Sequence, residues 1–129
     1  MLIDGVSAIL LISSNAEGLA RFYRDTLGLP LADEVHEGIP PHYACDLGGV
    51  HFAIHPADGW PGTATRDAQS PVLVLRTADA AAVAQRLRAG GFKAAGPSDH
   101  GFAHIVSFRD PDGNQVEILE PASRGRQRG

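Results

Sequence analysis

Val-Ser-Ala-Ile-Leu-Leu-Ile (residues 6–12) and Ser-Pro-Val-Leu-Val-Leu-Arg (residues 70–76) are two apolar runs that begin 64 residues apart. Each run precedes a helix-capping residue and then a helical stretch. The same offset relates Asp46-Leu47-Gly48-Gly49 to Asp110-Pro111-Asp112-Gly113, and each of these turns precedes another strand-like run. Because one offset aligns both the beginning and the end of the two copies, the lengths between these points also match. The sequence therefore predicts one supersecondary unit used twice.

The first copy has the pattern β-α-β-β-β. Residues 6–12 form a continuous apolar strand, and Asn15 can cap the helix that follows. The apolar residues of this helix recur at helical spacing, so one stripe can lie on a sheet, and Gly28 ends the helix. The stripe consists of Leu19, Phe22, Tyr23 and Leu27, and the remaining strands are expected near 30–35, 42–45 and 50–55.

The second copy repeats this pattern. Asp79 is the expected helix cap, Val83 and Leu87 lie on the apolar stripe, and Gly90-Gly91 ends the helix. The expected strands are 72–75, 92–95, 103–108 and 115–119. We therefore predict a single domain over residues 1–122. Its parts are module one (about 3–56), a linker (57–69) that contains Trp60, module two (about 70–121) and a flexible tail (123–129).

Composition narrows the class of protein. The chain has 129 residues, a formal net charge of −4 and 43% hydrophobic residues, as expected for a globular domain. The acidic balance argues against a nucleic-acid partner, and no apolar run is long enough to predict a membrane span. The N-terminal residues do not resemble a signal peptide, so a cytoplasmic location is expected. Cys45 is the single cysteine, which rules out an intrachain disulfide, and we expect it to be a buried structural thiol.

Two motifs give the chain a family resemblance. Phe-Tyr-Arg-Asp-Thr-Leu-Gly-Leu (22–29) and Phe-Arg-Asp-Pro-Asp-Gly-Asn-Gln-Val-Glu-Ile (108–118) resemble signatures of the vicinal oxygen chelate superfamily. That superfamily includes glyoxalase I, bleomycin-binding proteins and extradiol dioxygenases. The resemblance extends over about residues 3–121. It implies an α+β fold in which two βαβββ modules form a cup-shaped mixed sheet with helices on the convex face, and it favours a homodimer.

The resemblance also implies where a metal ion would bind. Metal-dependent members take one ligand from the first strand and one from the last strand of each module. The matching positions here are Ala8, Ala53, Val72 and Glu117. Only Glu117 carries a metal-binding group, and one carboxylate does not hold a divalent cation tightly. We therefore expect no standard metal site and no other cofactor; a divalent metal would need a different set of ligands.

Strand alternation identifies which side chains line the expected cup. On the strand near 50–55, His51 and His55 share the face opposite Phe52 and Ile54, and Glu117 occupies the symmetric position. The further candidates for ligand binding are Arg76, His104 and the linker residue Trp60. We place His104 on the cup-facing side with Val106 and Phe108, while His42 is a candidate on the matching strand of module one.

Each candidate also has a structural interpretation. Glu117 can act as a general base or ligand contact, or form an ion pair with Arg76. His51, His55 and His104 can contact a ligand or lie at the surface. Arg76 can attract an anion or form a rim ion pair, and Trp60 can stack on a planar ligand or pack on its own domain.

Two functional hypotheses follow. The first is a metal-free protein that binds a small, planar or cationic molecule in the cup, as bleomycin-binding members of the superfamily do. The second is an enzyme of the same superfamily. It would be either a metal-dependent lyase or dioxygenase that uses Glu117 with His51, His55 or His104, or a metal-free catalyst with Glu117 as the base. The missing ligand groups favour binding.

Overall fold

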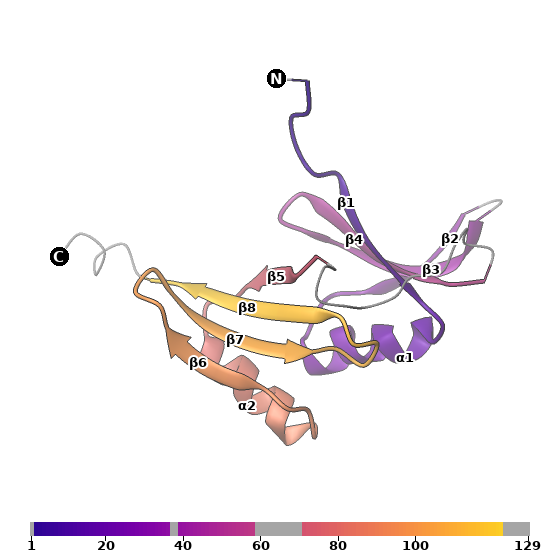
Figure 1. The fold of residues 1–129 in the computed structure, drawn as a ribbon. Helices are drawn as coiled ribbons and strands as arrows, with labels where there is room; N and C mark the ends of the chain where they lie inside the picture. Colours follow the sequence, from indigo (N-terminus) through magenta and orange to yellow (C-terminus); the bar gives the residue numbers. More distant parts are fainter. Residues whose placement is uncertain (1, 37–38, 59–70, 123–129) are drawn as a thin grey trace. The chain divides into compact units, whose positions relative to one another are not determined.

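The computed structural model describes residues 2–36, 39–58 and 71–122 (Figure 1). The chain divides into two compact units, Met1–Thr65 and Arg66–Gly129, and each contains one β-α-β-β-β module. Trp60, most of the predicted linker and the whole predicted tail lie outside the described residues. The two modules are described one at a time.

The first module is a four-stranded mixed sheet with the strand order β1-β4-β3-β2. Its edge strand β1 runs parallel to β4, whereas β3 runs antiparallel to both β4 and β2. The elements are β1 (Ala8–Ser13), α1 (Ala16–Arg21), β2 (Ala32–His36), β3 (Ile39–Leu47) and β4 (Val50–Pro56).

The second module has the equivalent strand order, β5-β8-β7-β6, with β5 parallel to β8. Its elements are β5 (Leu73–Arg76), α2 (Ala80–Ala89), β6 (Ala95–Asp99), β7 (Ala103–Arg109) and β8 (Gln115–Pro121). The parallel pairs share one register: Ile9 lies opposite Phe52, and Leu73 lies opposite Val116, 64 residues further along for both partners. The predicted fold of two βαβββ modules is therefore confirmed.

Both helices begin at the predicted caps. The Asn15 side chain accepts a hydrogen bond from the Gly18 N–H, and Asp79 accepts one from the Ala82 N–H. After α1 the backbone widens into a π-helical turn (Phe22–Thr26), in which the Leu27 N–H donates to the Phe22 carbonyl. Gly28, at φ 79°, then ends the helix in the left-handed region that glycine adopts at little cost.

Each helix packs on one face of its own sheet (Figure 1). On the first sheet this face carries Phe52, whose ring lies 5.3 Å from that of Tyr23, and both residues are fully buried. On the second sheet it carries Val116 and Ile118, and the helix contributes buried Ala84 and Leu87. We call the opposite side of each sheet its helix-free face. None of the helices in the described ranges combines the length and apolar character needed to cross a membrane.

One strand lies later in the sequence than predicted. The expected strand 92–95 is instead β6, Ala95–Asp99, which contains Pro97. Proline lacks the backbone N–H that a residue of a central strand donates to its neighbour. The structure accommodates Pro97 because β6 is an edge strand, and its pairing with β7 is irregular between Ala95 and Ser98.

The two long hairpins differ in their turns. Gly48 and Gly49, at φ 58° and 89°, form a two-residue turn that places Leu47 opposite Val50. In the second module five residues lie between the paired Arg109 and Gln115. The partners of residues in β7 and β8 are therefore shifted by one residue relative to the partners that the 64-residue repeat would give. A displacement of one residue moves a side chain to the other face of a sheet.

Candidate functional site

The four positions at which the family resemblance implies metal ligands do not provide a donor set here. Ala8 and Ala53 lie on the helix-free face of the first module, and Val72 lies immediately before β5. None of these three side chains has a ligating atom, so Glu117 stands alone at these positions. Within residues 2–36, 39–58 and 71–122, no group of three or more His, Cys, Asp or Glu side chains is arranged to hold a metal ion. These residues do not fit the usual metal.

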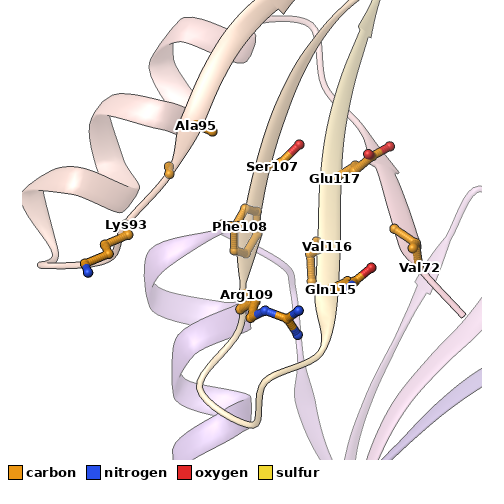
Figure 2. Close-up of a pocket in the computed structure, with 10 residues that line it drawn as sticks. Val72, Lys93, Ala95, Ser107, Phe108, Arg109, Gln115, Val116 and Glu117 are labelled. Carbon is orange, nitrogen blue, oxygen red and sulfur yellow. The ribbon is translucent and has the colours of Figure 1, made fainter. Parts of the chain in front are cut away.

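The second module contains a pocket with a volume of about 610 Å³. It is formed by residues of β7 and β8, by Val72 and by the segment that leads into β6 (Figure 2). Its lining combines apolar residues with four charged or amide groups. Phe108 and Val116 belong to the helix-covered face of the sheet, and Ser107 and Glu117 belong to its helix-free face. The lining residues are Val72, Lys93, Ala94, Ala95, Ser107, Phe108, Arg109, Gln115, Val116 and Glu117.

Glu117 is at the centre of a row of side chains that crosses this sheet. It lies opposite Ser107 on β7 and opposite Val74 on β5, and Ser107 lies opposite Ala95 on β6. Ser107 and Glu117 point to the same side of the sheet (Figure 2), so the helix-free face presents a hydroxyl beside a carboxylate at this pocket. This pair can accept hydrogen bonds from an amine, amide or hydroxyl group of a ligand.

Two cationic side chains belong to the same pocket. Lys93 lies in the segment before β6, and Arg109 ends β7, where its Nη1 donates to the Gly113 carbonyl oxygen at 2.9 Å. Arg76, by contrast, lies exposed at the end of β5, opposite Leu119. The described part of the chain contains no ion pair between Arg76 and Glu117, although the sequence allowed one.

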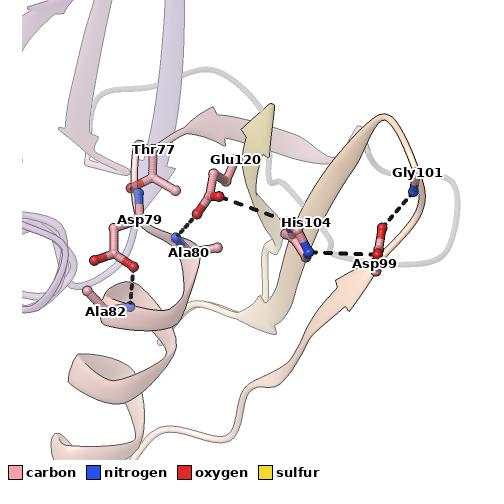
Figure 3. A network of polar contacts seen from close by, with 8 residues as sticks. All are labelled: Thr77, Asp79, Ala80, Ala82, Asp99, Gly101, His104 and Glu120. Carbon is pink, nitrogen blue, oxygen red and sulfur yellow. Dashed lines mark hydrogen bonds and ion pairs between the residues drawn. The ribbon is translucent and has the colours of Figure 1, made fainter. Parts of the chain in front are cut away.

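His104 does not belong to this site. It shares one face with Val106 and Phe108, as predicted, but pairing with Glu120, Ile118 and Val116 puts that face against α2. Glu120, the partner of His104, lies on the face that packs against α2, because its Oε1 accepts a hydrogen bond from the Ala80 N–H at the start of α2 (Figure 3). His104 lies between Glu120 and Asp99, with contacts of 4.0 and 3.9 Å. Placing His104 with the cup-facing residues was therefore wrong.

The displaced hairpin explains this error. A shift of 64 residues carries His42, on the helix-free face, to Val106, on the helix-covered face. The longer turn of the second module reverses the faces of β7 relative to the repeat, whereas β8 keeps the faces of β4. His104 and Glu117 consequently lie on opposite faces of one sheet and cannot bind the same ion.

The two histidines of β4 are arranged as predicted. His51 and His55 pair with Ala8 and Ile12 on the helix-free face of the first module. His55 is buried and stacks on His42 of β3, with ring centroids 4.1 Å apart and planes inclined by 12°. Burial lowers the pKa of His55, and the neighbouring His42 and His51 lower it further, while Glu34 opposes them. His55 is thus a neutral imidazole near neutral pH.

The sequence did not identify Glu34 as part of a site. Glu34 lies opposite His42 on β2, and its Oε1 is 3.1 Å from the His42 Nε2. The signal that could have revealed the cluster is the two-glycine turn, because pairing Leu47 with Val50 brings residues 42 and 55 opposite each other.

Cys45 lies on the other face, opposite Phe52, and is only half-buried; burial and then Asp46 raise the pKa of its thiol.

Comparison with known proteins identifies matches that extend over most of the chain. The model of the Glyoxalase/Bleomycin resistance protein/Dioxygenase superfamily matches residues 5–118. A comparison with curated protein sequences finds no significant match.

Similar solved structures include an antibiotic-binding protein. TnmS3, an antibiotic binding protein from Streptomyces sp. CB03234, has 28% identity and a TM-score of 0.72 over 95% of this chain and 99% of that protein. Virulence protein STM3117 from Salmonella typhimurium has 24% identity and a TM-score of 0.71 over 95% and 100%. Lactoylglutathione lyase from Agrobacterium tumefaciens has 17% identity and a TM-score of 0.65 over 91% and 93%. The last two show a shared fold.

Proposed function

The chain belongs to the Glyoxalase/Bleomycin resistance protein/Dioxygenase superfamily, and on this premise we propose that it binds a small organic molecule without the usual metal ion. The pocket of the second module is the proposed site, with Glu117 and Ser107 as its central polar contacts. A mainly apolar cavity with a few polar groups is typical of small-molecule sites. The similarity to TnmS3, described as an antibiotic binding protein, supports a ligand of this general kind.

The observation that carries this proposal is the loss of donor groups at the metal positions. Ala8, Ala53 and Val72 cannot ligate a metal, whereas Glu117 remains and lines the pocket. A carboxylate that no longer binds a metal is free to accept hydrogen bonds from a ligand. Binding rather than metal-assisted catalysis is thus the function that these residues support best.

The enzymatic alternative receives less support. Of the displaced ligand sets that the sequence allowed, the one that combines Glu117 with His104 is incompatible with their positions on opposite faces. Metal analysis of protein purified without chelators tests the remaining sets. We expect substoichiometric metal; one full equivalent of bound nickel, zinc, iron, manganese or cobalt would contradict the metal-free proposal.

The proposed binding function can be tested on the protein as purified. Native mass spectrometry should detect a co-purified small molecule, which denaturation then releases for identification. Glu117→Gln keeps the size of the side chain but removes its charge, and we expect it to weaken rebinding about tenfold or more. Asp112→Asn removes a carboxylate from the turn outside the pocket and serves as the control. Equal affinities for both variants and the unmodified chain would overturn the assignment of Glu117.

We also propose that the chain forms a homodimer. Both edge strands β1 and β5 carry exposed apolar side chains, with Leu10 42% and Val74 50% exposed. Exposed edge strands with apolar side chains are commonly covered by another strand or chain. Light scattering coupled to size-exclusion chromatography tests the proposal, and a monomer at micromolar concentration would contradict it.

The cytoplasmic location and a ligand contact by Trp60 stay predictions from the sequence.

A further inference from the structure

The pocket of the second module presents opposite charges on one face of its sheet. On the helix-free face, Ser107 of β7 lies opposite Glu117 of β8, and Arg109 lies opposite Gln115 (Figure 2). These four residues line the pocket, and each is exposed or half-buried. Because a strand rises about 3.3–3.4 Å per residue, the Ser107–Glu117 pair and the Arg109–Gln115 pair lie about 7 Å apart along the strands. A carboxylate and a guanidinium are thus accessible at one pocket, at a spacing set by the strands.

These two charges do not form an ion pair with each other. Arg109 and Glu117 are diagonal neighbours on adjacent strands, a position from which long side chains can reach each other. The Arg109 Nη1 instead donates to the Gly113 carbonyl oxygen at 2.9 Å, which holds the guanidinium at the turn. In the described part of the chain, the Glu117 carboxylate and the Gln115 side-chain amide have no hydrogen-bond or ion-pair partner. Both groups, and the remaining N–H donors of the guanidinium, are therefore available to a ligand.

The other charge that lines the pocket is positive. Lys93 lies exposed in the segment that leads into β6. Among the described lining residues, Glu117 is the single carboxylate, against the cations of Lys93 and Arg109. Asp110 follows Arg109 in the chain, but it is buried and its oxygens accept hydrogen bonds within the turn. The lining therefore suits a ligand that carries both signs of charge.

The first module has no equivalent of this arrangement. The positions that correspond to Gln115 and Glu117 on β8 are His51 and Ala53 on β4, whose partners on β3 are Asp46 and Ala44. Ala44 and Ala53 are 3% and 0% exposed and carry no polar group. The spaced pair of opposite charges is thus specific to the second module.

We propose that the pocket takes a zwitterionic small molecule, whose ammonium group contacts Glu117 and whose carboxylate contacts Arg109. The inference rests on the binding function proposed above and adds the charge pattern of the ligand. An ammonium group supplies charged donors to the Glu117 carboxylate, and the Ser107 hydroxyl can accept a further hydrogen bond from it. A carboxylate accepts from the guanidinium and from the Gln115 amide, while Lys93 adds positive charge. A ligand with one charge leaves the opposite charge of the pocket without a partner.

Four probes of nearly equal shape test the proposal on the unmodified chain. 4-(Aminomethyl)benzoate carries both charges, and its ring separates them by roughly the two-residue step of a strand. 4-Methylbenzoate lacks the ammonium group, 4-methylbenzylamine lacks the carboxylate, and 4-methylbenzyl alcohol has no charge. NMR titration should show the zwitterion shifting the resonances of residues 107–117. Each singly charged probe should bind about fivefold more weakly, and the neutral probe more weakly still, as expected for charged contacts that solvent partly screens.

Two variants assign each charge of the ligand to its partner. Glu117→Gln should largely remove the preference for 4-(aminomethyl)benzoate over 4-methylbenzoate and leave the preference for the carboxylate. Arg109→Gln should do the reverse. Arg76→Gln is the matched control, because Arg76 is an exposed arginine of the same sheet that does not line the pocket, and it should leave both preferences unchanged.

The outcomes separate this inference from the proposed function. Equal affinities of the four probes, no binding of any probe at millimolar concentration, or shifts confined to the first module would each overturn the zwitterion. A co-purified molecule without an ionisable group would confirm small-molecule binding and overturn the zwitterion, whereas one that carries an amine and a carboxylate would support both. Because the probe comparison uses the unmodified chain, it decides the question even if a variant does not fold.

Discussion

Replacing Asp110 should unfold the second module at a much lower denaturant concentration. Asp110 is 4% exposed, and its carboxylate accepts hydrogen bonds from the N–H groups of Asp112 and Asn114 at 3.0 and 2.9 Å. Its other oxygen accepts one from the Asn114 side-chain amide at 2.7 Å. These three bonds shape the turn that joins β7 to β8.

The magnitude follows from the groups that lose their acceptor. A buried donor left without a partner costs about 1–3 kcal/mol. The turn can open and let water reach some of the three donor groups, which reduces the total cost. Asp110→Ala should therefore lower the free energy of unfolding by about 2–4 kcal/mol. Asp110→Asn keeps one acceptor oxygen but turns an amide towards Asn114, and we expect it to cost about half as much. Both values refer to the free energy of unfolding.

Urea denaturation followed by circular dichroism measures these changes, with Asp112→Ala as the control. The Asp112 backbone, rather than its side chain, donates to Asp110, so this control should change the free energy of unfolding by less than about 0.5 kcal/mol. If Asp110→Ala were as stable as Asp112→Ala, the carboxylate would not be holding the turn. This motif also contributes to the family resemblance, so the result would show whether the resemblance reflects folding rather than chemistry.

Three further predictions concern single side chains. Because the pKa of His55 is lowered in the folded state, the unfolded chain binds the proton first, so the free energy of unfolding should decrease as the pH falls below about 6.5 and level off above it. Urea titrations at several pH values should show a smaller decrease for His55→Gln; an equal decrease would contradict the assignment. Glu120→Ala removes the acceptor at 2.8 Å from the Ala80 N–H and should cost about 0.5–2 kcal/mol in thermal unfolding, with Glu120→Gln closer to the unmodified chain; equal losses would argue against the cap. Leu87 is fully buried, so Leu87→Ala should lower the free energy of unfolding in urea by about 2–5 kcal/mol, and Leu87→Met by less than about 1.5 kcal/mol. Similar losses for the two variants would argue against tight packing under α2.

The order of elements could be predicted because local signals agree with one another. Asn15 and Asp79 both cap helices, Gly28 ends the first one, and the offset of 64 residues holds even for the register of the parallel strands. Only β6 was misplaced. Its residues include Pro97, which lacks a backbone N–H, and an edge strand with an irregular register tolerates it.

The face on which a candidate residue lies could be predicted only where the repeat preserves the face of a strand. Glu117, His51 and His55 lie on helix-free faces because β4 and β8 have the same register against their parallel partners. His104 was misplaced because the five-residue turn of the second module displaces β7 by one residue, and the period of two in a strand then reverses every side chain.

The sequence by itself determined the strand and helix order and the duplication, because these properties depend on residue type and spacing along the chain. It also shows that Ala8, Ala53 and Val72, where the family resemblance implies metal ligands, carry no ligating atom. The tertiary structure alone decided which side chains meet across strands. Glu34, His42 and His55 come from three strands and adjoin one another because hairpin geometry sets the register. That register depends on turn length and strand pairing, which periodicity within one strand does not contain.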